Sequence, residues 1–361
     1  MKIVTVVGAR PQFIKAAMVS RELRKNHKEV IVHTGQHFDY NMSKLFFDEL
    51  SIPKPDYNLG ISGGTHAQMT GSMMVAIEEV LQEEKPDCLL IYGDTNSTLA
   101  AALAGAKLYI PICHIEACSR NHSKTNPEEI NRKASDHVSS LLLVASPTAM
   151  KEAEHEGLSE NAVFIGNTMY DAFLKYSRRL EPKDITLQLL TGDKASVPDD
   201  YYYMTCHREE NTGTDKNLKE ILDAMNSLEH PVIFPVHPRN KERVIRLNKA
   251  RHYHNLLFSE PVGYLESTCL IRHCNKVVTD SGGLMSEAFF AQKKCVTILD
   301  MRVWPDTLVD GRNELCHPIK GEILAKLNNP QRIDPNYLPF GDGHAARKAV
   351  EAIETRIFGG L

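Results

Sequence analysis

The sequence lacks a strong charge of either sign and lacks any long apolar run. Its 42 basic and 46 acidic residues leave a formal net charge of −4, so no global basic field attracts nucleic acid or anionic lipid. No stretch approaches the roughly 20 apolar residues of a membrane span, and the N-terminus does not read as a signal peptide. These absences predict a cytoplasmic protein without nucleic-acid or membrane partners, in which local basic residues must hold any anionic ligand.

Paired cysteines are also missing. None of the eight cysteines forms a C-x-x-C pair, and most lie inside apolar, strand-like runs. In a large chain without a secretion signal, such cysteines are expected to be reduced and packed. The same lack of paired spacing argues against a structural zinc site, and we expect no metal.

The chain of 361 residues is long enough for two domains. Strand-like runs alternate with helical patterns in both halves, and Thr65-His66-Ala67-Gln68 predicts a capping-box helix start. This alternation is typical of parallel sheets with helices on both faces. We predict two doubly wound α/β domains, residues 1–175 and 176–344, and a final helix within 345–361 that packs back near the first domain.

Two glycine-containing turns follow predicted strands and precede predicted helices. They are Gly8-Ala9-Arg10-Pro11, with Lys15 close behind, and Thr279-Asp280-Ser281-Gly282-Gly283. Helix N-termini attract anions, and glycine allows close approach to the backbone. The first turn is equally consistent with a plain strand–helix connection. The second is the better diphosphate candidate, a role compatible with Ser281 as a helix N-cap. Neither is a complete Gly-x-Gly-x-x-Gly fingerprint after the first strand, which disfavours NAD.

Acidic residues stand where parallel strands are predicted to end. Asp94 and Glu116 each follow a strand, and Glu128 lies in Pro127-Glu128-Glu129. Ligands of open α/β sheets bind at the carboxyl edge of the strands, here expected to face an interdomain cleft. Carboxylates confined together repel one another, which raises at least one pKa and suits acid–base catalysis. Helix capping is the commoner role of a single strand-end acid, whereas two on neighbouring strands favour catalysis.

Two motifs of the second half each supply a histidine and an arginine after a predicted strand. They are His207-Arg208 and His237-Pro238-Arg239. A single histidine is more often structural, but the paired arrangement favours contacts to an anion. Neither histidine has the spacing or the acidic cluster that favours a metal.

Seven motifs, in the same order along the chain, resemble the bacterial UDP-N-acetylglucosamine 2-epimerase family. They are Gly8-Ala9-Arg10-Pro11-Gln12, Gly93-Asp94-Thr95-Asn96-Ser97, His114-Ile115-Glu116-Ala117, Pro127-Glu128-Glu129-Ile130-Asn131-Arg132, His207-Arg208-Glu209-Glu210-Asn211, Val236-His237-Pro238 and Thr279-Asp280-Ser281-Gly282-Gly283. The first motif and Gly35-Gln36-His37-Phe38-Asp39 are most similar to the branch acting on UDP-2,3-diacetamido-2,3-dideoxyglucuronate.

The resemblance implies two Rossmann-like domains in a glycosyltransferase-B-like arrangement, and an enzyme that inverts C2 of a UDP-N-acetylhexosamine without a cofactor. In the family, UDP is eliminated to give a glycal and then adds back, for polysaccharide precursor synthesis. A homodimer is expected. The resemblance implies catalytic roles for Asp94, Glu116, Glu128 and His207. It implies UDP-sugar binding by Arg10, Lys15, Arg132, His237, Ser281, Gly282, Gly283 and Glu287.

The chain departs from the family pattern in two loops. Cys118 stands where the pattern Glu-Ala-Gly-Leu-Arg has glycine, and Leu299–Trp304 lacks the usual Arg-Asp-x-Thr-Glu. Arg302 is our candidate to replace the lost charge, with a solvated side chain as the alternative. Two other functions stay open, a hydrolysing epimerase that releases a free mannosamine-type sugar and UDP, and a UDP-sugar-binding homologue with little catalysis.

Overall fold

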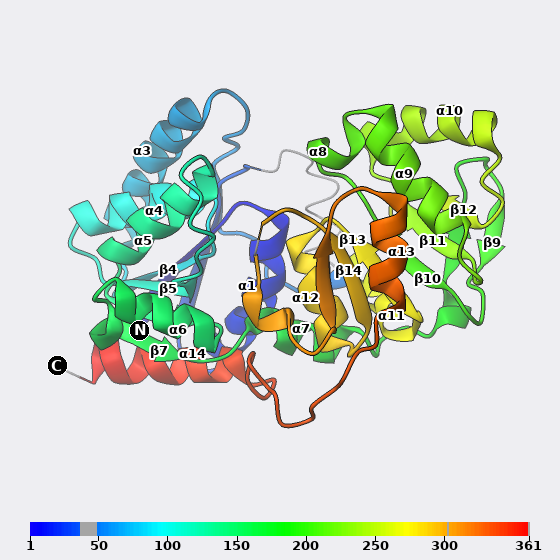
Figure 1. Ribbon diagram of the computed structural model, residues 1–361. Helices are drawn as coiled ribbons and strands as arrows, with labels where there is room; N and C mark the ends of the chain where they lie inside the picture. The colour runs from blue at the N-terminus through cyan, green and yellow to red at the C-terminus, as the bar shows by residue number, and fades with distance from the viewer. Residues whose placement is uncertain (37–48, 302, 360–361) are drawn as a thin grey trace. The chain divides into compact units, whose positions relative to one another are not determined.

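The computed structural model describes residues 1–36, 49–301 and 303–359. The chain divides into two compact units (Figure 1). Unit 1 comprises Met1–Ala172 and Leu338–Leu361, and unit 2 comprises Phe173–Tyr337. The sequence predicts these boundaries at 175/176 and 344/345. The two divisions differ within helix α7 (Thr168–Tyr176) and in a short segment before the last helix.

Unit 1 contains a seven-stranded parallel sheet in the order β3-β2-β1-β4-β5-β6-β7. The strands are β1 (Lys2–Val7), β2 (Lys28–His33), β3 (Tyr57–Asn58), β4 (Cys88–Tyr92), β5 (Ile112–Ala117), β6 (Leu141–Val144) and β7 (Ala162–Phe164). The central strand β4 is buried along its whole length. Continuous apolar strands of this kind are typical of a parallel sheet covered on both faces.

Helices cover both faces of this sheet. They are α1 (Arg10–Leu23), α3 (His66–Glu84), α4 (Asn96–Lys107), α5 (Pro127–Val138), α6 (Pro147–His155) and α14 (Ala345–Ile353), with the short 3-10 helix η1 (Ser159–Asn161) and the π-helix η5 (Glu354–Phe358). The apolar sides of α3 and α4 pack on one face, which includes Val32. The opposite face carries α1, because Phe13 stacks on His33, the alternate neighbour of Val32. The predicted capping box at the start of α3 is confirmed by bonds between Thr65 and Gln68.

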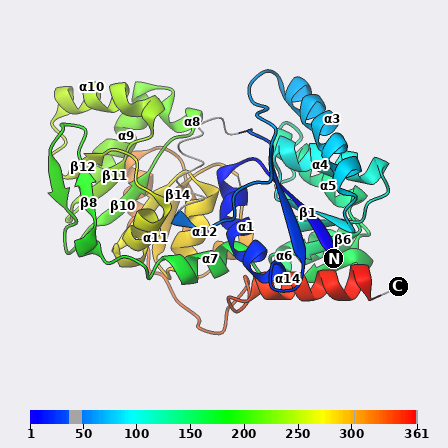
Figure 2. The same ribbon diagram turned by 180° about the vertical axis from the view of Figure 1, so that it is seen from behind.

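The last helix of the chain is tied to unit 1 by a buried aspartate. Asp171 accepts hydrogen bonds from the backbone N–H groups of Ala345 (3.0 Å) and Ala346 (2.8 Å). It thereby satisfies two of the amides that a helix start leaves without partners. Burial raises the pKa of Asp171, and these two amides act against that rise. Helix α14 packs against α1 of the same unit (Figure 2).

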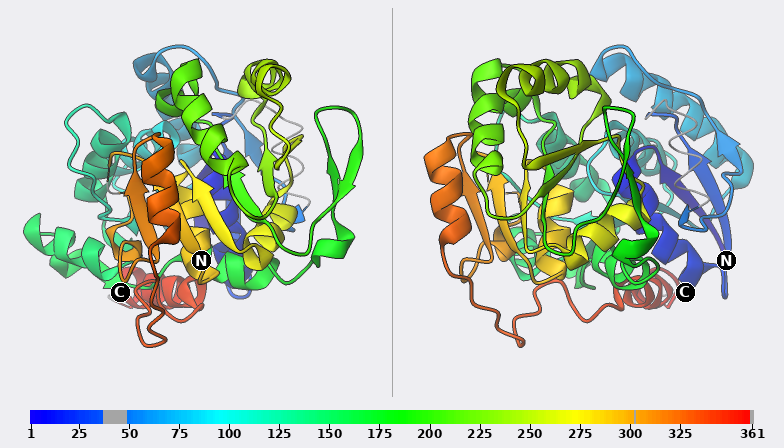
Figure 3. Two further views of the ribbon diagram at one scale, coloured as in Figure 1. Left: turned by 45° about the vertical axis from the view of Figure 1, so that its right-hand side comes forward. Right: turned by 90° about the vertical axis from the view of Figure 1, so that its right-hand side faces the viewer.

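Unit 2 contains a six-stranded parallel sheet in the order β12-β11-β10-β13-β14-β15 (Figure 3). The strands are β10 (Tyr202–Thr205), β11 (Val232–Pro235), β12 (Leu256–Ser259), β13 (Lys276–Thr279), β14 (Lys294–Ile298) and β15 (Asn313–Cys316). A separate antiparallel pair is formed by β8 (Thr186–Gln188) and β9 (Lys194–Ser196).

The helices of unit 2 also lie on both faces of its sheet. They are α8 (Glu209–Thr212), α9 (Asp215–Asn226), α10 (Lys241–Arg251), α11 (Tyr264–His273), α12 (Gly282–Phe290) and α13 (Lys320–Asn328), with short turns η2 (Pro182–Asp184), η3 (Pro238–Asn240) and η4 (Pro305–Thr307). One face packs against α9, α10 and α13 and includes Tyr202 and Met204. Between them, Tyr203 points to the other face and hydrogen-bonds Ser267 of α11 at 3.1 Å.

Each sheet has one point where the direction of strand addition reverses. In unit 1, β1 lies between β2 and β4, and in unit 2, β10 lies between β11 and β13. Loops that leave two such neighbouring strands diverge and open a space at the carboxyl edge of the sheet. This topology brings the Gly8 turn near the Asp94 loop, and His207 near Asp280.

All eight cysteines are buried and free. In the described parts of the chain, no helix is long and apolar enough to span a membrane. The same residues contain no group of three or more His, Cys, Asp or Glu side chains that could hold a metal ion.

Strand β5 ends irregularly at Glu116. Its register with β6 shifts between Ile115 and Ala117, and Glu116 and Cys118 have φ angles of 66° and 60°. By strand alternation, Glu116 would share a face with His114, which bonds to α5. Its carboxylate instead meets Lys15 of α1. The bulge therefore redirects the acid toward the opposite face of the sheet.

We expect Cys118→Gly to be more stable than Cys118→Ala by about 1 kcal/mol, because left-handed backbone costs a residue with a Cβ about 1–2 kcal/mol. Both variants remove the buried thiol, so they differ chiefly in backbone strain. Urea denaturation of the two proteins measures the difference. At a buried position of ordinary backbone, alanine would be the more stable of the two, and that order would contradict the assignment of strain.

Candidate active site

Gln12 joins the two diverging loops of unit 1. Its side-chain carbonyl accepts the N–H groups of Gly8 (2.8 Å) and Ala9 (3.0 Å). Its amide donates to the carbonyl oxygen of Tyr92 at 2.7 Å and to the hydroxyl of Thr95 at 3.1 Å. Gln12 is buried, so the loops after β1 and β4 are held in fixed register. Arg10, predicted to bind the ligand, is the first residue of α1 at this point.

Lys15 and Glu116 form an ion pair at the carboxyl edge of the sheet. The Nζ and Oε2 atoms are 2.5 Å apart, and the side chains are 6% and 14% exposed. Gly93 lies beside the pair with a φ of 61°, a left-handed backbone conformation that favours glycine. The electrostatic attraction between this carboxylate and this ammonium is stronger than it would be at the surface, because little water screens the two charges.

A second ion pair holds Asp94. Arg132 of α5 bonds to Asp94 through Nη2 and to Glu129 through Nη1, at 3.1 Å for the latter. Asn131 donates to the backbone oxygen of Asp94 at 2.9 Å. Burial opposes the charge of Arg132, but Asp94 and Glu129 more than offset it and raise the pKa of the guanidinium. The arginine is therefore a permanent cation beside a predicted catalytic acid.

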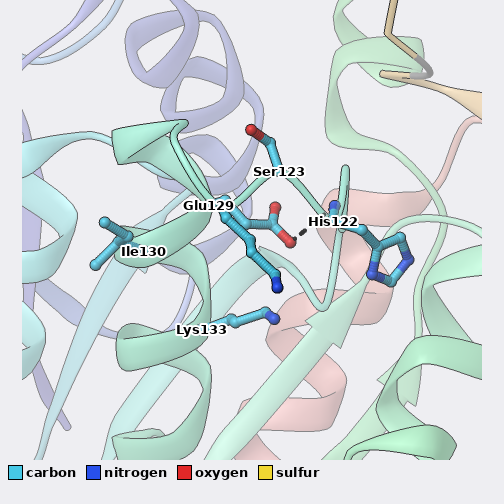
Figure 4. A pocket seen from close by; sticks show the side chains of 6 residues that line it. His122, Ser123, Glu129, Ile130 and Lys133 are labelled. Carbon is cyan, nitrogen blue, oxygen red and sulfur yellow. Dashed lines mark hydrogen bonds between the residues drawn. The ribbon is translucent and has the colours of Figure 1, made fainter.

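The adjacent glutamates at the start of α5 differ in environment. Glu128, the predicted catalytic residue, is exposed. Glu129 is 3% exposed, and it accepts the backbone N–H groups of Asn121 (3.0 Å) and His122 (3.2 Å). Figure 4 shows its carboxylate turned toward this loop, beside a surface pocket of about 300 Å³. Sequence reasoning assigned no role to Glu129. Its place in the first turn of a predicted helix was the only available signal.

His114 is a second residue that sequence reasoning left without a role of its own. The fully buried ring contacts Asp136 Oδ1 through Nδ1 and the carbonyl oxygen of Gly93 through Nε2, both at 2.7 Å. Arg120 Nη1 lies 2.7 Å from the other oxygen of Asp136. Burial alone would raise the pKa of Asp136, but His114 and Arg120 hold it below its usual value. With both ring nitrogens occupied, His114 supports the loop that carries Asp94.

In unit 2, His207 lies against a buried carboxylate. Its Nδ1 is 3.0 Å from Asp280 Oδ1, and the Asp280 side chain is fully buried whereas that of His207 is 40% exposed. The ring of His237 stacks on that of His207, with centroids 6.0 Å apart and planes at 21°. Arg239 donates to the backbone oxygen of His207, and Arg208 Nε donates to that of Asp280 at 2.8 Å. Two histidines and two arginines thus gather at one edge of this unit.

The predicted phosphate turn forms the start of α12. Ser281 is its N-cap, with Oγ 3.4 Å from the N–H of Leu284. Gly282 and Gly283 are the first two helical residues, and an added Cβ at Gly283 would meet nothing closer than 3.8 Å. The predicted ribose partner Glu287 is buried in the same helix. Arg302 lies outside the described residues, so its proposed compensation stays a prediction.

The structure brings several predicted residues together within each unit. In unit 1, Lys15 joins Glu116, and Arg132 joins Asp94. In unit 2, His207 joins His237 at the strand edge where Ser281 also begins its helix. Carboxylates are candidate bases for proton abstraction, and basic side chains beside a helix start suit a phosphate.

Comparison with known proteins identifies relatives over nearly the whole chain. The family profile described as UDP-N-acetylglucosamine 2-epimerase matches residues 21–354. A UDP-N-acetylglucosamine 2-epimerase homolog of Methanococcus maripaludis is 44% identical, covering 98% of this chain and 99% of that protein. The UDP-2,3-diacetamido-2,3-dideoxy-D-glucuronate 2-epimerase of Pseudomonas aeruginosa is 41% identical, covering 97% and 99%.

Solved structures show the same similarity. The Methanocaldococcus jannaschii UDP-GlcNAc 2-epimerase, solved in complex with UDP-GlcNAc and UDP, matches with a TM-score of 0.85 at 35% identity, covering 98% of this chain and 99% of that one. A lipopolysaccharide outer core galactosyltransferase, with a TM-score of 0.55 and 14% identity, shares the fold alone. These matches confirm the predicted fold class, two Rossmann-like doubly wound domains of the glycosyltransferase-B-like class.

The two glutamates of α5 allow a matched test of these environments. We expect Glu129→Gln to lower the free energy of unfolding by about 1–3 kcal/mol, because the amide cannot accept from two backbone N–H groups and bind Arg132 as the carboxylate does. Glu128→Gln is the control, since the same change on the adjacent exposed residue leaves those bonds intact. Thermal and urea unfolding compare them. Equal stabilities would show that the Glu129 contacts contribute nothing.

Proposed function

The chain belongs to the UDP-N-acetylglucosamine 2-epimerase family, and we propose that it inverts C2 of a UDP-N-acetylhexosamine for the synthesis of polysaccharide precursors. The observation that carries this proposal is the pair of acids at neighbouring strand ends. Glu116 is held by Lys15 at a backbone irregularity, and Asp94 is held by Arg132. Backbone strain that persists at a charged residue is typical of a functional position.

We assign the proton transfers at C2 to the side chains of unit 1. A carboxylate among Asp94, Glu116 and Glu128 removes the proton from C2. The electron pair of the C2–H bond forms the C1=C2 double bond, and that of the C1–O bond leaves with UDP. In the return step a protonated acid delivers a proton to the opposite face of C2, and UDP adds again at C1. Two groups on opposite faces of the sugar are needed, which is why more than one acid belongs to the proposal.

We assign UDP to basic side chains and to the start of α12. The departing diphosphate carries negative charge, which helix N-termini and cations stabilise. The exposed Gly283 and the N-cap Ser281 support a phosphate contact there. The paired His207 and His237 support the same assignment. Arg10, Lys15 and Arg132 are proposed as further cations and Glu287 as the ribose acceptor, on the basis of the family resemblance.

The proposal also concerns which sugar the substrate carries and whether UDP remains attached to the product. The relatives named above include enzymes for UDP-GlcNAc and for UDP-2,3-diacetamido-2,3-dideoxy-D-glucuronate, so a test panel contains both. We favour the non-hydrolysing outcome, in which UDP stays attached to the product. A hydrolysing enzyme would release free sugar and UDP from the same panel. The family resemblance also supports a cytoplasmic location and a homodimer. Light scattering tests the homodimer.

Incubation with the UDP-sugar panel in D₂O tests the reaction. We expect the C2 epimer to carry deuterium at C2 and to remain linked to UDP, because an acid open to water returns a solvent proton. NMR of the product detects both features. Epimer that retains the original hydrogen would overturn elimination, and UDP released with free sugar would identify the hydrolysing alternative.

Asp94→Asn and Glu116→Gln should each lower kcat by well over tenfold, because general acid–base groups supply about 10²–10⁴-fold. Because Glu116→Gln leaves the buried Lys15 ammonium without its carboxylate, we expect that variant to melt lower, and turnover is compared at a temperature at which both variants are folded. Glu22→Gln, which removes a surface partner of Lys25, is the control for charge loss. Turnover near the wild-type rate in either variant, or unfolding of both, would contradict the catalytic assignment.

A further inference from the structure

Each unit contains a histidine–aspartate pair near the carboxyl edge of its sheet. In unit 1, both ring nitrogens of His114 are occupied, by Asp136 and by the Gly93 carbonyl oxygen. In unit 2, Nδ1 of His207 contacts Asp280, and the ring is 40% exposed. The two pairs therefore have different consequences. Both nitrogens of the first ring have partners. The second ring has a partner at Nδ1 and is partly exposed.

The surroundings of Asp280 determine which atom carries the proton. Its carboxylate accepts the backbone N–H groups of His207 and Arg208, both at 2.8 Å to Oδ2, and the side-chain amide of Asn211 at 3.2 Å. Burial alone would raise the pKa of Asp280, but the His207 side chain and these backbone amides hold it below its usual value. Asp280 is therefore an ionised acceptor with no proton to donate.

An ionised acceptor at 3.0 Å requires a proton on the nitrogen that faces it. Nδ1 of His207 must then be the donor. In the neutral ring the second nitrogen, Nε2, is left unprotonated, because the hydrogen bond of one nitrogen sets the state of the other. The His207 side chain is 40% exposed, and no hydrogen bond to Nε2 is formed among the residues that the structure describes.

We propose that Asp280 is a positioning residue that fixes His207 as the Nδ1–H tautomer and presents Nε2 as the atom that exchanges a proton with the diphosphate oxygen that leaves C1 and returns to it. This inference rests on the proposed function for its catalytic part, whereas the tautomer itself is a property of the free protein. His237 stacks on the same ring and limits its rotation. Arg239 donates to the backbone oxygen of His207, and Asn240 donates to that of Cys206. These two bonds fix the backbone that carries the His207 ring.

The tautomer can be measured directly in the full-length protein. With ¹⁵N-labelled histidine, NMR at a pH where the neutral ring dominates should show the proton of His207 on Nδ1 and none on Nε2. His207→Gln identifies the signal by its loss, and the exposed His254 serves as an internal control for an unconstrained ring. A proton on Nε2 of His207 in the wild-type protein overturns the proposal, whatever the activity.

Titration with UDP in the same sample tests which nitrogen meets the ligand. We expect the Nε2 signal of His207 to shift on saturation while the proton stays on Nδ1, hydrogen-bonded to Asp280. Asp280→Asn should lose the Nδ1–H preference if the variant folds. A UDP response confined to Nδ1, or an unchanged tautomer in the folded Asp280→Asn protein, contradicts the assignment.

His207→Asn provides the matched activity test. Its side-chain amide can replace Nδ1 as the donor to Asp280, but it has no atom at the position of Nε2. We expect melting close to the wild type and a fall in kcat of more than about 10²-fold. Turnover within a few-fold of the wild type would show that Nε2 does not act, and the proposal fails. A wild-type protein that epimerises no UDP-sugar would defeat the proposed function alone, because the NMR result still decides the tautomer.

Discussion

Charged side chains at the ends of buried strands need partners, because the strands leave them with little water. An unpaired buried ion costs several kcal/mol. Three such groups among the residues that the structure describes have an opposite charge or a set of amide donors. Lys15 meets Glu116, Arg132 meets Asp94, and Asp280 meets the amides around His207. The geometry of the candidate site follows from these pairings, since a side chain that must keep its partner cannot turn away from the edge of the sheet.

The fold and part of the site could be predicted because they depend on local patterns. Alternating strand and helix signals indicate two doubly wound sheets, and such sheets place their strand ends at one edge. Asp94 and Glu116 could therefore be selected from the sequence, as could the capping box at Thr65. The start of α12 at Ser281 could be predicted for the same reason, since a serine followed by two glycines after a strand is a local signal.

The partners of these residues could not be predicted, because they are distant in sequence. Gln12 and Tyr92 are joined across two loops, and Asp280 reaches His207 only because β10 and β13 are neighbours in the sheet. Glu129 and Glu128 are adjacent and chemically identical, but they point to different sides of α5, and the loop at Asn121 and His122 lies on the side of Glu129. Sequence identifies the chemical groups, whereas strand order determines which groups meet.

The bulge at the end of β5 has a consequence for how this protein could lose activity. A regular strand through Glu116 would keep the sheet, the acid and most of the core, yet it would turn the carboxylate away from Lys15. Under the proposed assignment of Glu116, catalysis then depends on the backbone path as much as on side-chain identity. A homologue that accumulates substitutions could retain Asp94, Glu116 and Glu128 and still become inactive through changes at Ala117 or Cys118. Inspection of the acids alone would not distinguish such a chain from an enzyme.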